Sequence, residues 1–322
     1  MPTFGFTTTA EEVAAAFASK LKGKNVIITG TSLNGLGFET ARVIAKYANL
    51  VVITGYNAER LKLSEDALKQ ENPAANVRPL ILNLASLAAV RSAAAEVNAY
   101  PEPIHVLINN AASSLCPFKL TLDGFEHQMG TDHLGPFLFT ALIAPKIVAS
   151  ASASYTPRVV YVASGSHAWC DGVNLSEMEH PDPSTYKAMT AYAQAKSANI
   201  LTAIELSKRA GGRINAYSLR PGAIATNFVA NEEARGNCWQ PVRIVDAEGK
   251  PNLSAKLPWK TLPQGAATNV TAAFDPALND KPGCYLTDSA EDNKSIAAHT
   301  SDPVMAEKLW ALSEHLVGEK FF

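Results

Sequence analysis

The sequence has no excess of one charge, no long apolar run and no secretory signal. Among its 322 residues, 28 Lys and Arg are balanced by 30 Asp and Glu, so nucleic acid and anionic membrane surfaces are not expected partners. The most apolar window, 134–149, is too short to span a bilayer and contains two prolines and a lysine. Residues 1–20 lack the basic and continuous apolar regions of a signal peptide. We therefore expect a cytoplasmic protein.

Cysteine is also scarce, and its spacing carries no motif. No two of Cys116, Cys170, Cys238 and Cys284 form a C-x-x-C pair, so neither a zinc knuckle nor a redox motif is visible. No cluster of His, Cys and Glu has metal-ligand spacing, which argues against a catalytic zinc. We expect no bound metal.

The chain instead alternates short apolar runs with longer helical patterns. The runs are nearly continuous, which is typical of strands buried on both faces of a parallel sheet. The six expected strands are 25–30, 50–55, 77–84, 105–111, 158–164 and 213–222. The expected helices between them are 39–48, 58–70, 87–97, 125–150 and 191–208. This pattern predicts an α/β fold with a doubly wound, mainly parallel sheet, helices on both faces, and sites beyond the carboxyl ends of the strands.

The whole chain, 1–322, is expected to form a single domain. A capping box of Thr9 and Glu12 predicts a short N-terminal helix over about 9–22. Two polar, proline-bearing regions, 166–186 and 228–262, interrupt the regular pattern. Both follow strands on the side where ligands bind, so they are candidate lids or substrate walls. Surface insertions without a function are the alternative.

The stretch TGTSLNGLG, 29–37, lies between the first expected strand and a helix. Gly30, Gly35 and Gly37 have no Cβ, so backbone N–H groups there can approach a pyrophosphate at the helix N-terminus. The spacing is not the usual G-x-G-x-x-G. A tight turn without a ligand is therefore an equal alternative from this loop alone.

Tyr192 and Lys196, in YAQAK, are four residues apart and share one face of an expected helix. A phenol has a pKa of about 10, and a fixed ammonium nearby lowers it. Such a tyrosine can donate or accept a proton near neutral pH. A Tyr-x-x-x-Lys pair on its own is common and mostly structural.

The order of the motifs decides between these alternatives. NNAA (109–112), Ser164 at a strand end, YAQAK and LRPGAIATN (219–227) follow the glycine loop. This set resembles the short-chain dehydrogenase/reductase family, and 260–273, 283–288 and 309–318 extend the similarity to its retinol-dehydrogenase-like branch. The resemblance implies a Rossmann-type fold. It also implies a metal-independent NAD(P)-dependent oxidoreductase that transfers hydride between the cofactor and a ketone, aldehyde or alcohol.

The resemblance also implies roles for individual residues. Tyr192 would be the general acid/base, Lys196 would bind the nicotinamide ribose and lower the phenol pKa, and Ser164 would polarise the substrate oxygen. Asn109 would brace the central strands. The implied cofactor contacts are Gly30, Ser32, Asn34, Gly35, Leu36, Gly37, Tyr56, Asn83, Leu84, Asn110, Ala111, Ala112, Tyr192, Lys196, Pro221, Gly222, Ile224 and Thr226.

Several positions depart from the family pattern. Four residues, 31–34, separate the first two loop glycines instead of three, and Ala112 replaces a glycine. Asp132, in DHLGPF, stands where the family has its fourth catalytic residue, an asparagine that acts through its backbone carbonyl. Activity can therefore survive, while an ionised carboxylate would disfavour the phenolate of Tyr192. His133 and His167 flank the site and are expected to be hydrogen-bonding residues rather than catalysts.

The cofactor is expected to be NADP, by a weak preference, or NAD. A strict NAD enzyme places a carboxylate after the second strand, whereas 54–57 is Thr-Gly-Tyr-Asn.

Small-molecule substrates are the expected partners, and a homo-oligomer is a further expectation, because helices beginning near 121 and 186 often pair between subunits in this family. Two alternatives stay open. One is a non-catalytic dinucleotide-binding or scaffold protein, which Asp132 favours, and the other is a nucleotide-sugar epimerase or dehydratase, which shares Tyr-x-x-x-Lys.

Overall fold

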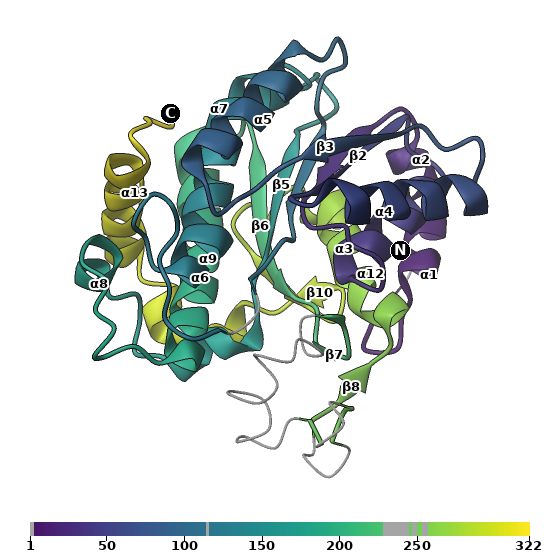
Figure 1. Ribbon diagram of the computed structural model, residues 1–322. Coiled ribbons are helices and arrows are strands. Elements are labelled where there is room, and N and C mark those ends of the chain that lie inside the picture. Colours follow the sequence, from purple (N-terminus) through teal and green to yellow (C-terminus); the bar gives the residue numbers. More distant parts are fainter. Residues whose placement is uncertain (1–2, 114–115, 228–244, 247–249, 253–256) are drawn as a thin grey trace.

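A computed structural model describes residues 3–113, 116–227, 245–246, 250–252 and 257–322, and its centre is an eight-stranded sheet (Figure 1). The strand order is β10-β9-β6-β5-β4-β1-β2-β3, the Rossmann order, and among the described strands of this sheet only β9 and β10 pair antiparallel. The strands are β1 Asn25–Ile28, β2 Leu50–Gly55, β3 Val77–Ile81, β4 Val106–Asn109, β5 Arg158–Val162, β6 Asn215–Arg220, β9 Tyr285–Thr287 and β10 Ala290–Glu291. The predicted α/β sheet is confirmed.

The six strands expected from the sequence are all present, and five are shorter than expected. Their last residues leave the ladder to form the loops where the site is built. The central strands β1, β4 and β5 are buried throughout, in agreement with their continuous apolar runs. The strands β9 and β10 were not predicted, and neither was a small parallel pair, β7 Ala223–Ile224 with β8 Trp259–Lys260. With two or three residues each, they are too short to show a period.

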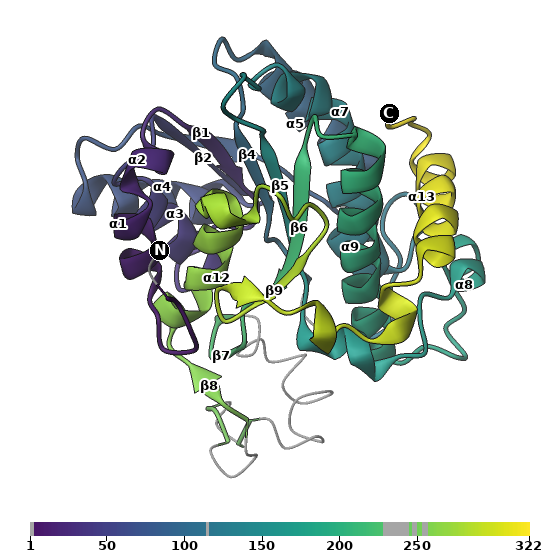
Figure 2. The ribbon, with the colours of Figure 1, turned by 180° about the vertical axis from the view of Figure 1, so that it is seen from behind.

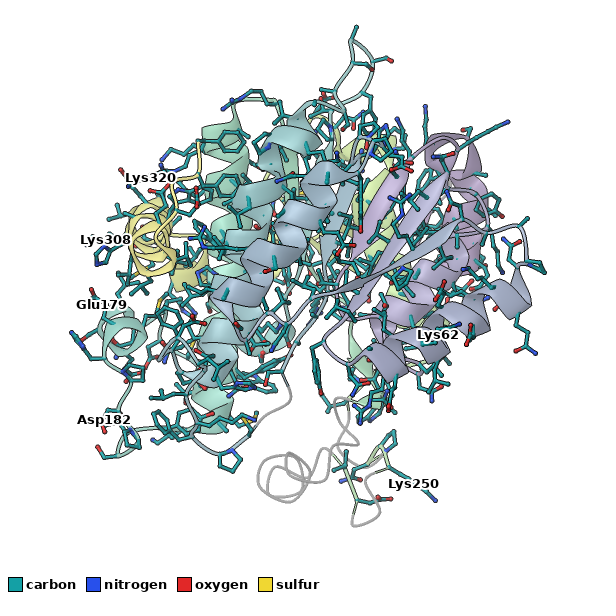
Figure 3. All side chains as sticks on the ribbon, turned by 45° about the horizontal axis from the view of Figure 1, so that its top comes forward. Lys62, Glu179, Asp182, Lys250, Lys308 and Lys320 are labelled. Carbon is teal, nitrogen blue, oxygen red and sulfur yellow. The ribbon has the colours of Figure 1, made fainter. Side chains whose placement is uncertain are left out.

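Helices cover both faces of the sheet (Figures 1 and 2). One face carries α1 Ala10–Ala16, α3 Leu36–Ile44, α4 Ala58–Glu71 and α12 Leu262–Phe274, which share a core with β1 and β2. The other face carries α5 Leu87–Ala99, α7 Gly135–Val148, α9 Ala188–Ala210 and the C-terminal α13 Pro303–Val317. Charged side chains such as Lys62 on α4 and Lys308 on α13 lie at opposite flanks of the molecule (Figure 3).

The N-terminal capping box is present, but the helix after it is interrupted. The Thr9 hydroxyl accepts the N–H of Glu12, and the Glu12 carboxylate accepts the N–H of Thr9. The single helix expected over about 9–22 is divided at Phe17 into α1 and α2 Ala18–Leu21. Phe17 leaves the helical conformation and buries its ring edge-on against Phe4, at 5.6 Å between centroids. Burial of an aromatic ring thus overrides a local helical pattern.

The C-terminal helix α13 lies on the outside of α7 and α9 (Figure 2). Trp310 of α13 packs edge-on against Phe137 of α7, with ring centroids 5.0 Å apart, and Phe321 contacts both rings. None of the helices that the structure describes is long and apolar enough to cross a membrane.

Candidate active site

The glycine loop between β1 and α3 forms a cradle that side chains would fill. Gly30 has φ +70°, and a Cβ there would lie 2.7 Å from Cα of Ala111. A Cβ on Gly37 would collide with the Gly30 carbonyl and the Asn110 amide. The N-cap of α3 is Gly35, which has no side chain to cap the first-turn N–H groups. These amides at a helix N-terminus fit a pyrophosphate, so the geometry favours the dinucleotide interpretation over an empty turn.

Thr29 and Asn110 hold this cradle in shape. The Thr29 hydroxyl accepts the N–H groups of Asn110 and Ala111, both at 2.9 Å. The Asn110 amide donates to the carbonyls of Thr29, at 2.8 Å, and Gly30, at 3.1 Å. Thr29 was missed as a site residue, although its place directly before the first glycine could have indicated it.

Asn109 was expected to brace the central strands, and its side chain anchors the central strand β4. The Asn109 amide donates to the Thr140 hydroxyl at 3.0 Å and so ties β4 to α7. Successive side chains of a strand point to opposite faces. Asn109 therefore points into the layer of α7, whereas its neighbour Asn110 reaches the glycine loop.

The structure brings Ser164, Tyr192 and Lys196 together beyond the carboxyl end of β5. Ser164 follows the strand, caps the 3-10 helix Gly165–Trp169, and has its hydroxyl close enough to the Tyr192 phenol to lower the pKa of that phenol. Tyr192 is 8% exposed, on the second turn of α9. One turn further, Nζ of Lys196 is buried at 5.3 Å from the Tyr192 ring centroid and 3.4 Å from the carbonyl oxygen of Val162. The phenol of Tyr192, the hydroxyl of Ser164 and the ammonium of Lys196 thus lie next to one another.

Asp132 completes the group from the opposite side. It lies in a five-residue π-helix, Gly130–Leu134, between α6 His127–Met129 and α7. Its Oδ2 lies 3.1 Å from Nζ of Lys196, and its Oδ1 accepts the backbone N–H of Ser113 at 2.6 Å. Widened helical turns of this kind often occur at functional sites. Ser113 was missed, because a backbone contact leaves no mark on residue type.

Burial dominates the proton affinities here, and neighbouring charges modify them. Burial raises the pKa of the Tyr192 phenol, Lys196 opposes this increase, and Asp132 adds to it. Burial alone would lower the pKa of the Lys196 ammonium, but Asp132 and Tyr192 leave it above its usual value. Burial raises the pKa of the Asp132 carboxyl against the opposing effect of Lys196. The lysine therefore keeps its proton.

The segment after β2, where NAD and NADP enzymes differ, has no acidic side chain among residues 54–57. The Asn57 side chain accepts the N–H of Arg60 and caps α4, and the Thr54 hydroxyl accepts the N–H of Gly30 at 3.3 Å. Tyr56 is 69% exposed. Beside this strand end, the Asn83 side chain accepts the N–H of Ala85 and shapes the turn after β3.

The segment 221–227 contacts the cofactor loop. Gly222 has φ +102°, and a Cβ there would lie 2.9 Å from Cδ of Lys260. The amide of Asn227 donates to the Leu33 carbonyl at 2.6 Å. Leu33 belongs to the stretch that is one residue longer than the family pattern, so this longer loop has a partner that sequence reasoning missed. Most of the expected insertion 228–262 lies outside the described residues.

The insertion 166–186 contains the 3-10 helix after Ser164 and α8 Leu175–Glu179 before α9 begins. The side chain of Gln194 accepts the N–H of Asn174 at 2.6 Å and donates to Glu177 at 3.2 Å, which ties the insertion to α9. A surface pocket is lined partly by this insertion, through residues such as Glu177, Met178 and Asp182, and partly by residues such as Phe118 and Gln194. Within the described part of the chain, none of the site residues predicted from the sequence lines this pocket.

Comparisons with known proteins agree with this geometry. Residues 24–168 match the family model described as short chain dehydrogenase. The short-chain dehydrogenase TIC 32 A, chloroplastic, of Brassica napus is 34% identical over 98% of this chain and 94% of its own length. The WW domain-containing oxidoreductase of Danio rerio is 34% identical over 93% of this chain and 70% of its own length.

A solved structure of an uncharacterized protein from Mycobacterium paratuberculosis also matches. It is 27% identical, with a TM-score of 0.69, and the match covers 95% of this chain and 98% of that one. The identity to the curated relatives extends over nearly the whole chain, so the protein belongs to the short-chain dehydrogenase/reductase family of NAD(P)-dependent oxidoreductases.

Proposed function

We propose that this protein interconverts a ketone or aldehyde with the corresponding alcohol, without a metal, and uses Tyr192 as general acid/base. The observation that supports this most is the juxtaposition of the Tyr192 phenol and the Lys196 ammonium, which are both buried, with the half-buried Ser164. Because all three of these side chains are present, an enzyme is favoured over a non-catalytic relative of the same fold.

The glycine cradle and Lys196 are the groups that would hold the cofactor. The amides of the first turn of α3 would bind the pyrophosphate, and the ammonium would bind the nicotinamide ribose. When bound, the nicotinamide supplies or accepts the hydride.

The chain's own residues handle the proton. In reduction, Tyr192 donates its phenolic proton to the substrate oxygen, and in oxidation its phenolate removes the alcohol proton. The Lys196 ammonium stabilises the phenolate. The Ser164 oxygen accepts the N–H of Ser166 at 3.2 Å, so its own proton is available to Tyr192 or to the substrate oxygen.

A weak preference for NADP is part of the proposal. No carboxylate in 54–57 would repel a 2′-phosphate, and Arg60 lies in the first turn of α4. The branch related to retinol dehydrogenases is a resemblance and not a substrate assignment, because one fold hosts many chemistries.

A panel of ketones, aldehydes and alcohols, tested with NADH and NADPH or their oxidised forms, tests the proposal. We expect coenzyme-dependent turnover of at least one compound and its loss in Tyr192→Phe. Tight nucleotide binding without turnover of any compound would instead favour the dinucleotide-binding scaffold. Turnover of a nucleotide-sugar without net change in coenzyme would favour the epimerase.

A further inference from the structure

His167 lies three residues after Ser164 and is 2% exposed. Its Nδ1 is 2.7 Å from the Ser164 carbonyl oxygen, and its Nε2 is 3.2 Å from the backbone nitrogen of Ala297. A carbonyl oxygen can only accept a hydrogen bond, and an amide N–H can only donate one. These two contacts fit a neutral imidazole with its proton on Nδ1.

This imidazole restrains the backbone that carries the Ser164 hydroxyl. The Ser164 carbonyl also accepts the N–H of His167 at 3.2 Å, and the Ser164 oxygen accepts the N–H of Ser166. Residues 164–167 thus form one closed turn. A shift of the Ser164 carbonyl would rotate the hydroxyl away from Tyr192, the phenol whose pKa it lowers.

The C-terminal segment that follows β10 supports the same turn from behind. His299 Nε2 lies 3.1 Å from the His167 carbonyl oxygen, and the Ser197 hydroxyl donates to that oxygen at 3.2 Å. Ser197 also contacts the Thr300 hydroxyl at 3.4 Å and directly follows Lys196 in α9. Residues 297–300 therefore contact both the turn that follows Ser164 and the helix α9 that carries Lys196.

We propose that His167 is a positioning residue for Ser164, and that Ala297 sets its tautomer so that Nδ1 donates. The inference deepens the proposed function and rests on it. A donor at Nδ1 orients the Ser164 backbone, and the N–H of Ala297 prevents the ring from placing its proton on Nε2. Misplacement of a catalytic group by about 1 Å can cost about 100-fold in rate.

Two substitutions of His167 by amide residues test the roles of the two ring nitrogens separately. In His167→Asn, the side-chain amide places an N–H donor at the position of Nδ1. An amide NH2 always carries its protons, so this donor does not depend on a tautomer set by a neighbour. His167→Gln reaches the position of Nε2, where its oxygen can accept the N–H of Ala297, but it leaves the Ser164 carbonyl without the donor. We expect kcat to fall about 10- to 100-fold in His167→Gln and less than about threefold in His167→Asn.

In a protein that lacks the Ser164 hydroxyl, the substitution His167→Gln should cause no further loss of kcat. We expect Ser164→Ala and the double variant Ser164→Ala/His167→Gln to have the same kcat, because His167 acts through Ser164. Cofactor affinity, measured by fluorescence, and the thermal midpoint should be similar in the Asn and Gln variants. Equal kcat in the Asn and Gln variants, or an additive loss in the double variant, would overturn the inference.

Hydrogen exchange gives a readout that needs no substrate. Amides of residues 164–167 should exchange faster in His167→Gln than in His167→Asn. If the wild-type protein turns over no carbonyl or alcohol yet shows this contrast, the proposed function fails and the positioning of Ser164 stands. If the protein is active and the exchange rates are equal, the positioning role fails alone.

Discussion

Nζ of Lys196 and Oδ2 of Asp132 form an ion pair of 3.1 Å in the protein interior, and the two side chains are 2% and 0% exposed. The second carboxylate oxygen accepts the N–H of Ser113, just beyond the alanines of the expected cofactor groove. A carboxylate at the position of the family's asparagine thus contacts the Lys196 ammonium directly, as well as acting on Tyr192 through its charge. The pair links the β4 loop, the π-helix and α9.

Asp132→Asn is predicted to move the tyrosine limb of the alcohol-oxidation pH profile to lower pH. The charged groups that face Asp132 are Lys196 and Tyr192 on α9 and Glu126 at the start of α6. Asp132 raises the phenol pKa, so its removal favours phenolate. At a separation on the order of 8 Å and an effective dielectric constant near 20, the effect is about 2 kcal/mol before screening, or about one pH unit after it.

The exposed Asp280 offers a control for this experiment. Asp280→Asn changes the net charge equally and should leave the limb in place. An unmoved limb in Asp132→Asn would mean that the Asp132 carboxyl is neutral in the working enzyme. Complete inactivity would mean that the carboxylate has a direct role that the family comparison does not supply.

Lys196→Met is predicted to lower the free energy of unfolding by about 3–5 kcal/mol, because it leaves a buried carboxylate without its cation. The double variant Asp132→Leu/Lys196→Met removes both charges and should recover most of that loss. Urea unfolding of the two single variants and the double variant measures the coupling. Strictly additive losses would show that the pair contributes no mutual stabilisation.

Tyr192→Phe is predicted to reduce kcat by about 100- to 10,000-fold while cofactor affinity stays nearly unchanged, because only the proton-transfer group is lost. Lys196→Met should weaken both turnover and cofactor binding. Fluorescence titration with the cofactor separates the two variants. Similar losses of affinity would contradict distinct roles for the phenol and the ammonium.

Tyr56→Asp is predicted to reduce the preference for NADPH over NADH at least tenfold. The new carboxylate would stand directly after β2, where it repels a 2′-phosphate and accepts a hydrogen bond from a free ribose hydroxyl. Tyr56→Asn is the matched control, because it changes size without adding charge. A wild-type preference for NADH of tenfold or more would contradict the assignment of NADP.

Acidification is predicted to destabilise the fold through buried His133. Burial lowers its pKa to about 3, and its Nε2 lies 2.8 Å from the Ser313 hydroxyl. The unfolded chain, with a histidine pKa of about 6.5, binds more protons than the folded protein between those two values. Stability is therefore lost as pH falls below about 6.5, by about 1.4 kcal/mol per pH unit for this group.

His133→Gln should reduce the dependence of the free energy of unfolding on pH. Between pH 6.5 and pH 5, the variant should lose about 2 kcal/mol less than the wild-type protein. His180 is exposed, and His180→Gln serves as the matched control. Equal slopes in the two variants would show that His133 takes up its proton in the folded state as readily as in the unfolded chain.

Local physics made much of this protein predictable from its sequence. Continuous apolar runs identified the central strands β1, β4 and β5, which are buried throughout, because burial on both faces excludes most polar residues. Gly30 and Gly37 identified the cradle, because no larger residue fits where the loop approaches Ala111 and Asn110. Tyr192 and Lys196 could be paired because four residues make about one helical turn.

Only the tertiary structure decided which groups from distant parts of the chain meet. Asp132 contacts Lys196, and His167 contacts Ala297, through contacts that no periodicity encodes. The short β9 joins β6 because the sheet has an open edge there. Phe17 leaves the helical conformation where its own ring is buried edge-on against the half-buried Phe4. Local spacing determines where a side chain can point, but the free energy of a buried polar contact depends on what the fold places opposite it.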